Sequence, residues 1–378
     1  MSGYLDRLAR VEIRAGRRLW PPFQVCGSVG LAMAVLLAMT LVRETGLSWM
    51  VMAALIAASI AAFVGLALAT KVITGEERII YYHHEIAVIL VSVAVLRGLR
   101  QPVLPYLDIT VLGIGVFLAC GRVGCLMVGC CHGRPCRWGI RYGEEHAAAG
   151  FPHYMAGARL FPVQALESLW VLAVVAVGAY LVLRGGPPGT AFTWYIVGYG
   201  AGRFCFEFLR GDAVRPYFHG ISQAQWISVL SIGAAAWEER SAVLAAVAVG
   251  LILLSFGMAE SRRPWREFDL RHPRHVREIA SALDRIGGTP ATADGKVNVA
   301  CTSYGLQISG QLLGDAAAPI RYYAFARRDG PLSRQSTDLL TEVILHLRPF
   351  HGTANLVPGN RGVFHLIVHP APTGGIGQ

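Results

Sequence analysis

The chain has 378 residues, of which 54% are hydrophobic and only 15% are charged, and its formal net charge is +10. A soluble globular protein usually carries about 25% charged residues. The low charged fraction therefore excludes an ordinary soluble protein. No nucleic-acid-binding motif accompanies the arginines, so we interpret the positive charge as membrane-related.

Apolar blocks before residue 258 predict an α-helical polytopic membrane protein with about seven transmembrane helices, or eight if the last block forms two spans. Each crossing of a bilayer core needs about 20 apolar residues. The block 222–258 is too long for one simple span and is interrupted by Glu238, Glu239 and Arg240, so it forms either one long helix or two short spans. The predicted spans are 22–43, 49–72, 84–99, 106–128, 163–184, 190–209 and 222–258.

The pattern divides the chain into four parts. Residues 1–21 are a basic segment, either a membrane-surface segment or an ordinary charged flank, and 22–258 form the membrane domain. Residues 259–370 predict a small soluble α+β domain, because strand-like alternation at 296–309, 320–327 and 362–368 surrounds helical spacing at 333–347. Residues 371–378 are expected to be a disordered tail.

Polar residues inside predicted spans are expensive and therefore suggest function. They form three groups: His83, His84 and Glu85 at the start of the third span, Arg122 near the end of the fourth, and Arg203, Glu207 and Arg210 near the end of the sixth. With alternating crossings, all three groups reach the same membrane face, together with the long polar loop 129–162. Two arginines braced by one carboxylate at helical spacing suit phosphate binding, although a purely structural ion-pair cluster has the same spacing.

Two glycine-containing strings at these positions resemble the signatures of the prolipoprotein diacylglyceryl transferase family. The order and separation of the motifs agree over about residues 20–258. Pro162, Gln164, Glu167 and Ser168 match the start of the family's fifth span, Ser222 and Gln225 the start of its seventh, and Tyr82-His83 an aromatic–histidine pair. The two strings are Gly121-Arg122-Val123-Gly124-Cys125, continued by Gly129-Cys130-Cys131-His132-Gly133, and Tyr199-Gly200-Ala201-Gly202-Arg203-Phe204, continued by Glu207-Phe208-Leu209-Arg210.

The resemblance implies transfer of a diacylglyceryl group from phosphatidylglycerol to the lipobox cysteine thiol of a prolipoprotein, with glycerol phosphate leaving. It implies that Arg122 and Arg203 hold the phosphate, that His83 assists proton transfer from the thiol, and that Glu207 orients Arg203. The implied substrate-binding residues are Tyr199, Arg210, Gly121, Gly124, Cys125, Gln164 and Glu167. This chemistry requires no metal, so no cofactor is expected.

The expected partners are phosphatidylglycerol, the signal peptides of prolipoproteins and the bilayer, with no nucleic acid, and the expected location is the cell inner membrane as a multi-pass protein. The chain departs from the family pattern where Cys125 and Cys130 replace an asparagine and a glutamate, and where Phe161 and Leu166 replace a histidine and a tyrosine. It also carries a C-terminal domain outside that pattern. A family relative acting on another lipid or acceptor, and a non-catalytic lipid-binding module, are therefore alternative functions.

The cysteine-rich stretch has three open interpretations. Five of the eight cysteines lie between Cys120 and Cys136, with gaps of five, five, one and five residues. Zinc sites usually have paired cysteines two to four residues apart, so this spacing is not the usual metal pattern. Close packing at a helix end, or a disulfide between Cys136 and Cys130 or Cys131, are the other interpretations.

Overall fold

The computed structural model of the protein describes residues 5–75, 81–212, 217–218, 221–261, 273–286, 298–314, 319–328, 330–350 and 352–370. The predicted disordered tail, 371–378, lies outside the described residues. Residues 262–272, near the start of the predicted C-terminal domain, also lie outside the described residues.

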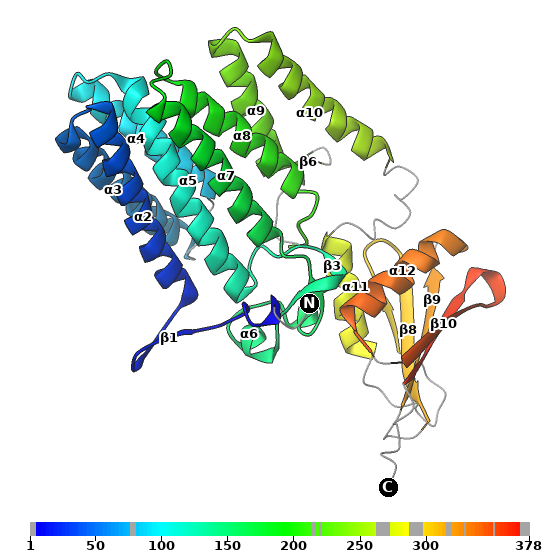
Figure 1. Ribbon diagram of the computed structural model, residues 1–378. Coiled ribbons are helices and arrows are strands. Elements are labelled where there is room, and N and C mark those ends of the chain that lie inside the picture. The colour runs from blue at the N-terminus through cyan, green and yellow to red at the C-terminus, as the bar shows by residue number, and fades with distance from the viewer. Residues whose placement is uncertain are drawn as a thin grey trace.

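Helices α2–α5 and α7–α10 form an antiparallel bundle (Figure 1). Within the described residues, α2, α3, α5 and α7 are long and apolar enough to cross a membrane, and α10 contains a shorter apolar stretch. Many of the large apolar side chains on the bundle surface are exposed, as a lipid-facing surface requires. The chain is therefore a mostly helical membrane protein. The helices are α2 (Pro22–Thr45), α3 (Trp49–Thr74), α4 (Tyr81–Gly98), α5 (Val103–Val128), α7 (Val163–Leu183), α8 (Thr190–Phe206), α9 (Gln223–Glu238) and α10 (Ala242–Ser261).

The predicted single block at 222–258 is a helical hairpin, and not one long helix. Helix α9 ends at Glu238, and the chain reverses through Glu239 and Arg240. Arg240 adopts a left-handed backbone conformation with φ 47°. Charged side chains are costly at the bilayer centre, so this charged trio favours a turn in the aqueous phase. The hairpin brings the end of α10 back to the end of the bundle where α2 begins (Figure 1).

Small residues allow α5 to lie at the centre of the bundle. A Cβ atom added to Gly115 would come within 2.5 Å of Val175 on α7, and one added to Gly178 would come within 2.4 Å of Leu112. Close backbone approach of this kind is the usual basis of helix packing in membranes. The buried carboxylate of Asp108 also accepts hydrogen bonds from the backbone amides of Gly189 and Phe192, both at 2.7 Å, at the start of α8.

The connection between α5 and α7 folds as a compact cap on one end of the bundle. It contains β3 (Pro135–Arg141), α6 (Glu144–Ala148), the 3₁₀ turn η1 (His153–Met155) and β4 (Arg159–Leu160), which pairs antiparallel with β3. We call this segment, residues 129–162, the cap loop. The basic N-terminal segment includes the hairpin of β1 (Ile13–Ala15) and β2 (Arg18–Trp20), and Asp6 pairs with Arg159 of the cap loop at 3.2 Å.

The C-terminal region is β-rich and contains one five-stranded antiparallel sheet in the order β10-β11-β9-β8-β7. The predicted strand 296–309 is in fact two strands, because Thr302–Gly305 forms a turn in which Gly305 has φ 77°. Strand β10 was not predicted from the sequence. The elements are α11 (Pro273–Ile286), β7 (Val299–Cys301), β8 (Leu306–Leu313), β9 (Ile320–Arg327), α12 (Arg334–Leu347), β10 (Gly352–Pro358), η3 (Asn360–Gly362) and β11 (Phe364–Pro370), and the short pair β5 (Tyr217–Phe218) and β6 (Ile221–Ser222) precedes α9.

The C-terminal domain and the cap loop share one hydrophobic core. Ile140, Tyr142 and Phe151 of the cap loop belong to the same buried cluster as Ile279 and Leu340 of the domain. The Arg348 guanidinium donates to the Tyr154 carbonyl at 3.1 Å and also to Asp284. The domain therefore lies at the cap-loop end of the bundle, on the same side as the N-terminus (Figure 1).

Candidate active site

The polar groups inside the membrane domain meet at the cap-loop end of the bundle. Helices α4, α7 and α9 begin at this end, and α5 and α8 finish there (Figure 1). Arg122 lies in the last two turns of α5, and Arg203 in the last turn of α8. Alternation of the crossings therefore brings together side chains from helices that are far apart in the sequence, such as Arg122 and Arg203.

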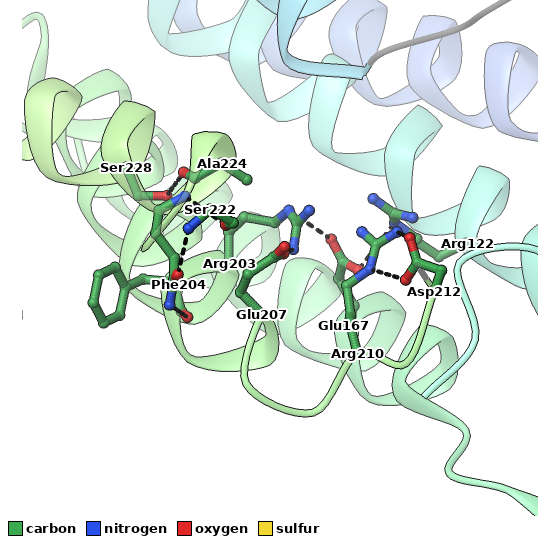
Figure 2. Close-up of polar contacts among 11 residues, drawn as sticks. Arg122, Glu167, Arg203, Phe204, Glu207, Arg210, Asp212, Ser222, Ala224 and Ser228 are labelled. Atoms are coloured by element: carbon green, nitrogen blue, oxygen red, sulfur yellow. Dashed lines mark hydrogen bonds and ion pairs between the residues drawn. The ribbon is translucent and has the colours of Figure 1, made fainter. Parts of the chain in front are cut away.

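Glu167 connects the two predicted phosphate-holding arginines. Its carboxylate lies 3.1 Å from Arg122 Nε and 3.9 Å from Arg203 Nε. Arg203 Nη1 donates to Glu207 at 2.5 Å, one helical turn later. Figure 2 shows these side chains from α5, α7 and α8 directed toward one another. All four are buried, and the Glu167 side chain is only 1% exposed.

Arg210 joins this group and fastens it to the cap loop. It makes a two-pronged pair with Asp212, at 2.9 and 3.0 Å. Its backbone forms an isolated antiparallel bridge with Gly133, and the Gly211 amide donates to the His132 carbonyl at 2.9 Å. The end of α8 and the start of the cap loop therefore behave as one structural unit around the arginines.

The charges of this group balance, because Arg122, Arg203 and Arg210 face Glu167, Glu207 and Asp212 (Figure 2). Charge balance is what permits several guanidinium groups to be buried without ligand. Arg122 nevertheless retains an unused donor: within the described residues its buried Nε, although 3.1 Å from the Glu167 carboxylate, makes no hydrogen bond. Planar guanidinium groups of this kind bind phosphate oxygens in pairs.

Gln164, Ser168 and Gln225 hold the ends of the helices in place. Gln164 donates to the Cys130 carbonyl at 2.8 Å, and Ser168 donates to the Ala119 carbonyl at 2.9 Å, so α7 is tied to the end of α5. Gln225 donates to the Phe204 carbonyl at 3.3 Å and completes a capping box with Ser222. These contacts position the arginines, and the predicted substrate-binding role of Gln164 stays a prediction.

An aromatic cluster lies on the interior side of the arginines. Tyr199 stacks on Tyr195 with ring centroids 5.7 Å apart and meets Tyr81 edge-on at 6.1 Å. Glu85 is buried beside these rings. Tyr81, Tyr195 and Asp212 were not singled out from the sequence. Tyr81 adjoins the Tyr82-His83 pair and Asp212 lies two residues after Arg210, so proximity to the motifs was the available signal for those two.

His83 lies at the start of α4 with an exposed side chain, and its ring packs edge-on against Tyr82 at 4.6 Å. The next two residues, His84 and Glu85, are buried. The His84 ring lies against Phe63 of α3 in a tilted arrangement, with ring centroids 4.6 Å apart. Among the described contacts, none joins His83 directly to the arginine group, so its role in proton transfer stays a prediction.

The predicted glycine positions have different surroundings. A Cβ atom added to Gly121 would meet nothing within 4 Å, whereas one added to Gly124 would lie 3.3 Å from both Phe23 and Cys26 of α2. Gly124 therefore has a visible packing role. Ligand binding at Gly121 and Gly124 remains a prediction.

The cysteines at the end of α5 converge, although their sequence spacing is unusual. The sulfur atoms of Cys125, Cys130 and Cys131 all lie within 4.8 Å of one another. All eight cysteines are free thiols, so the structure does not contain the alternative disulfide with Cys136. His132, next to this group, is buried, and its Nδ1 donates to the Gly133 carbonyl at 2.8 Å. Burial lowers the pKa of His132, and the nearby Asp212 carboxylate opposes part of that shift.

An apolar cavity of 230 Å³ lies between α2, α3, α4 and α5. Leu31, Met52, Ile60 and Phe117 contribute to its walls, and Tyr81, His84 and Glu85 line it too. A largely hydrocarbon-lined space with a few polar side chains suits an amphiphilic molecule.

Comparison with known proteins matches this chain to diacylglyceryl transferases. The family model described as prolipoprotein diacylglyceryl transferase matches residues 23–238. A phosphatidylglycerol–prolipoprotein diacylglyceryl transferase of Clostridium tetani is 30% identical over 130 residues, which cover 34% of this chain and 50% of the relative. One from Dehalococcoides mccartyi is 33% identical over 129 residues, covering 34% and 48%, and one from Clostridium perfringens is 33% identical over 132 residues, also covering 34% and 48%. The chain spans about half the length of the curated relatives it matches.

Proposed function

This chain belongs to the prolipoprotein diacylglyceryl transferase family, and we propose that it transfers a diacylglyceryl group from phosphatidylglycerol to the lipobox cysteine thiol of prolipoproteins. The observation that carries the proposal is the buried group of Arg122, Glu167, Arg203 and Glu207 at one end of a membrane bundle. It offers guanidinium donors for a phosphate at one end of the apolar helices.

In the proposed reaction the acceptor sulfur forms a bond to the carbon of the diacylated glycerol that carries the phosphate. The bond between this carbon and the phosphate oxygen breaks. Glycerol phosphate leaves with the electron pair, and the thiol proton goes to a base. Negative charge develops on the leaving phosphate, so donors fixed beside it stabilise the transition state. Arg122 and Arg203 are the proposed donors. Glu207 and Glu167 keep them in place without competing for every donor of Arg122.

The remaining predicted residues take supporting roles. We assign proton transfer to His83 at the start of α4, and headgroup contact to Tyr199, Arg210, Gly121 and Cys125 around the arginines. The cavity between α2 and α5 is of the right character to hold acyl chains, since its walls are mostly hydrocarbon. The proposed partners are phosphatidylglycerol and prolipoprotein signal peptides, and the proposed location is the cell inner membrane as a multi-pass protein.

The test is a transfer assay with the purified full chain, labelled phosphatidylglycerol and a lipobox peptide. We expect labelled diacylglycerol to become attached to the peptide cysteine, and none to a matched peptide with serine in its place. Well-folded protein that transfers nothing, under conditions where an established family member works, would exclude this function.

A second candidate is the same chemistry with another lipid or another thiol acceptor. Cys125 and Cys130 favour it, because two neutral thiols replace polar residues of the family pattern beside the proposed headgroup site. Repeating the assay with phosphatidylethanolamine, cardiolipin and small thiols separates the two. Faster transfer from one of these than from phosphatidylglycerol to the lipobox peptide would favour the second candidate.

A further inference from the structure

Three thiols gather beside the arginine group. Cys125 comes from the last turn of α5, and Cys130 and Cys131 follow the glycine that ends the helix. Gly129, with φ 86°, terminates α5, and the chain then turns back so that all three sulfur atoms lie within 4.8 Å of one another. Cys130 and Cys131 are half-buried, and the Cys125 thiol is buried against the end of the helix.

Two features show that this convergence is held in place by its surroundings. Cys131 has φ 53°, in the left-handed region that non-glycine residues adopt at a cost. The Cys130 carbonyl accepts a hydrogen bond from the buried Gln164 side chain at 2.8 Å. Apolar packing of three small side chains requires neither feature. An observed outlier of this kind is a reason to look for function.

We propose that Cys125, Cys130 and Cys131 form a three-thiolate site for a soft metal ion, with Zn²⁺ as the first choice. Zn²⁺ binds thiolate sulfur at about 2.3 Å, so tetrahedral ligation places sulfur atoms about 4 Å apart, and small side-chain rotations from the observed spacing suffice. Thiolates select zinc and copper(I) over magnesium and calcium. Binding replaces the three thiol protons, which are released to water.

The charges around the site favour this assignment. Three thiolates with one Zn²⁺ carry a net charge of −1. Arg122 lies close enough to interact electrostatically with Cys125 and Cys131, and Arg210 interacts with Cys131. Arginine donors next to a thiolate-bound metal neutralise its surplus negative charge. The same guanidinium groups that suit a phosphate therefore also stabilise the metal-bound form.

Three protein ligands leave one tetrahedral position open, as in catalytic zinc sites. The next step rests on the proposed function. The acceptor thiol would occupy this open position, because a thiol that coordinates zinc is deprotonated outright. On binding, the acceptor thiol would lose its proton to the proposed base, His83. Its sulfur would then form the bond to the lipid carbon as glycerol phosphate leaves with the electron pair. The metal keeps its oxidation state throughout.

The experiment titrates Co²⁺, a spectroscopic substitute for Zn²⁺, into the purified full chain after reduction and chelation. We expect one ion per chain, with the intense near-ultraviolet absorption of sulfur-to-cobalt charge transfer, and displacement of cobalt by Zn²⁺. Cys125→Ser, Cys130→Ser and Cys131→Ser should each lose the band. Cys205→Ser should keep it, because Cys205 is an exposed, isolated thiol on α8. Size-exclusion profiles confirm that each variant is folded.

The wild-type spectrum decides the metal site even if a variant fails to fold. Three results would each overturn the metal site. They are the absence of a charge-transfer band, a band that persists in folded Cys131→Ser, and a disulfide between two of the three cysteines that excludes the metal. A lipobox peptide, but not its serine counterpart, should shift the band, and an unchanged band would overturn thiol binding at the open position. Transfer is measured separately with and without chelator. Full transfer by the metal-free protein would overturn thiol activation while leaving the proposed function intact.

Discussion

Replacement of Arg122 by lysine tests the phosphate-binding assignment most directly. The Arg122 side chain is 8% exposed, and its Nε lies 3.1 Å from Glu167. Lysine keeps the positive charge but loses the planar fork of donors. The Glu167 carboxylate therefore keeps a positively charged partner. Loss of that partner would destabilise the folded state by about 3–5 kcal/mol in a buried site. The folded state should survive the substitution.

The expected loss is in the reaction rate. Removing one fixed donor to a developing oxyanion typically lowers kcat by about 10²–10³, or about 2.7–4 kcal/mol of transition-state stabilisation. We expect Arg122→Lys to fall in this range, and Arg122→Ala to fall further. The assay is transfer of labelled diacylglycerol from phosphatidylglycerol to a lipobox peptide, normalised to the amount of monodisperse protein.

The matched control is Arg137→Lys in the cap loop. The Arg137 side chain is 84% exposed and lies 3.9 Å from Glu342, an arrangement worth about 0–1 kcal/mol. Its substitution should leave transfer unchanged. The reasoning fails if Arg122→Lys transfers at a near-normal rate. It also fails if activity declines only in step with the amount of folded protein, because that pattern belongs to a structural ion pair.

Three further outcomes follow from the geometry. Glu207→Gln removes the negative charge 2.5 Å from Arg203 without removing the arginine, so transfer should fall less than in Arg203→Ala; an equal or larger loss would contradict a positioning role. Gly133→Ala places a Cβ atom 2.3 Å from the Phe161 carbonyl oxygen, beside the backbone bridge to Arg210, and should lower both thermal stability and transfer. Gly143→Ala, whose Cβ atom would meet nothing within 4 Å, should behave like the wild type. Equal behaviour of the two variants would count against the bridge as part of the site. Removal of residues 265–378 should leave a folded bundle with a less stable cap loop, because Ile140, Tyr142 and Phe151 would lose their apolar partners. The expected signs are faster proteolysis within 129–162 and binding of an apolar dye, and unchanged proteolysis would show that the shared core does not stabilise the cap loop. Arg348→Ala should give a weaker version of the same effect, and Arg328→Ala, at an exposed position, is its control.

Local patterns in the sequence were sufficient for the membrane class, most helix positions and the residue types of the candidate site. Apolar runs reveal spans because the requirement for a hydrocarbon surface acts on each helix separately. Arg203 and Glu207 pair as their spacing predicts, because residues four apart on a helix are neighbours. Strand β9 and helix α12 agree with the predicted segments within a residue for the same local reason.

Contacts between distant segments were decided only by the tertiary structure. Sequence reasoning assigned Glu167 to substrate binding, yet in the fold its carboxylate lies between Arg122 and Arg203, which belong to two other helices. The gaps between cysteines argued against a metal site, but the end of α5 and the left-handed Cys131 bring three sulfur atoms together. The C-terminal domain, separate by composition, shares its core with the cap loop. Hydropathy and spacing describe one segment at a time, whereas burial and ion pairing depend on which segments the bundle brings side by side.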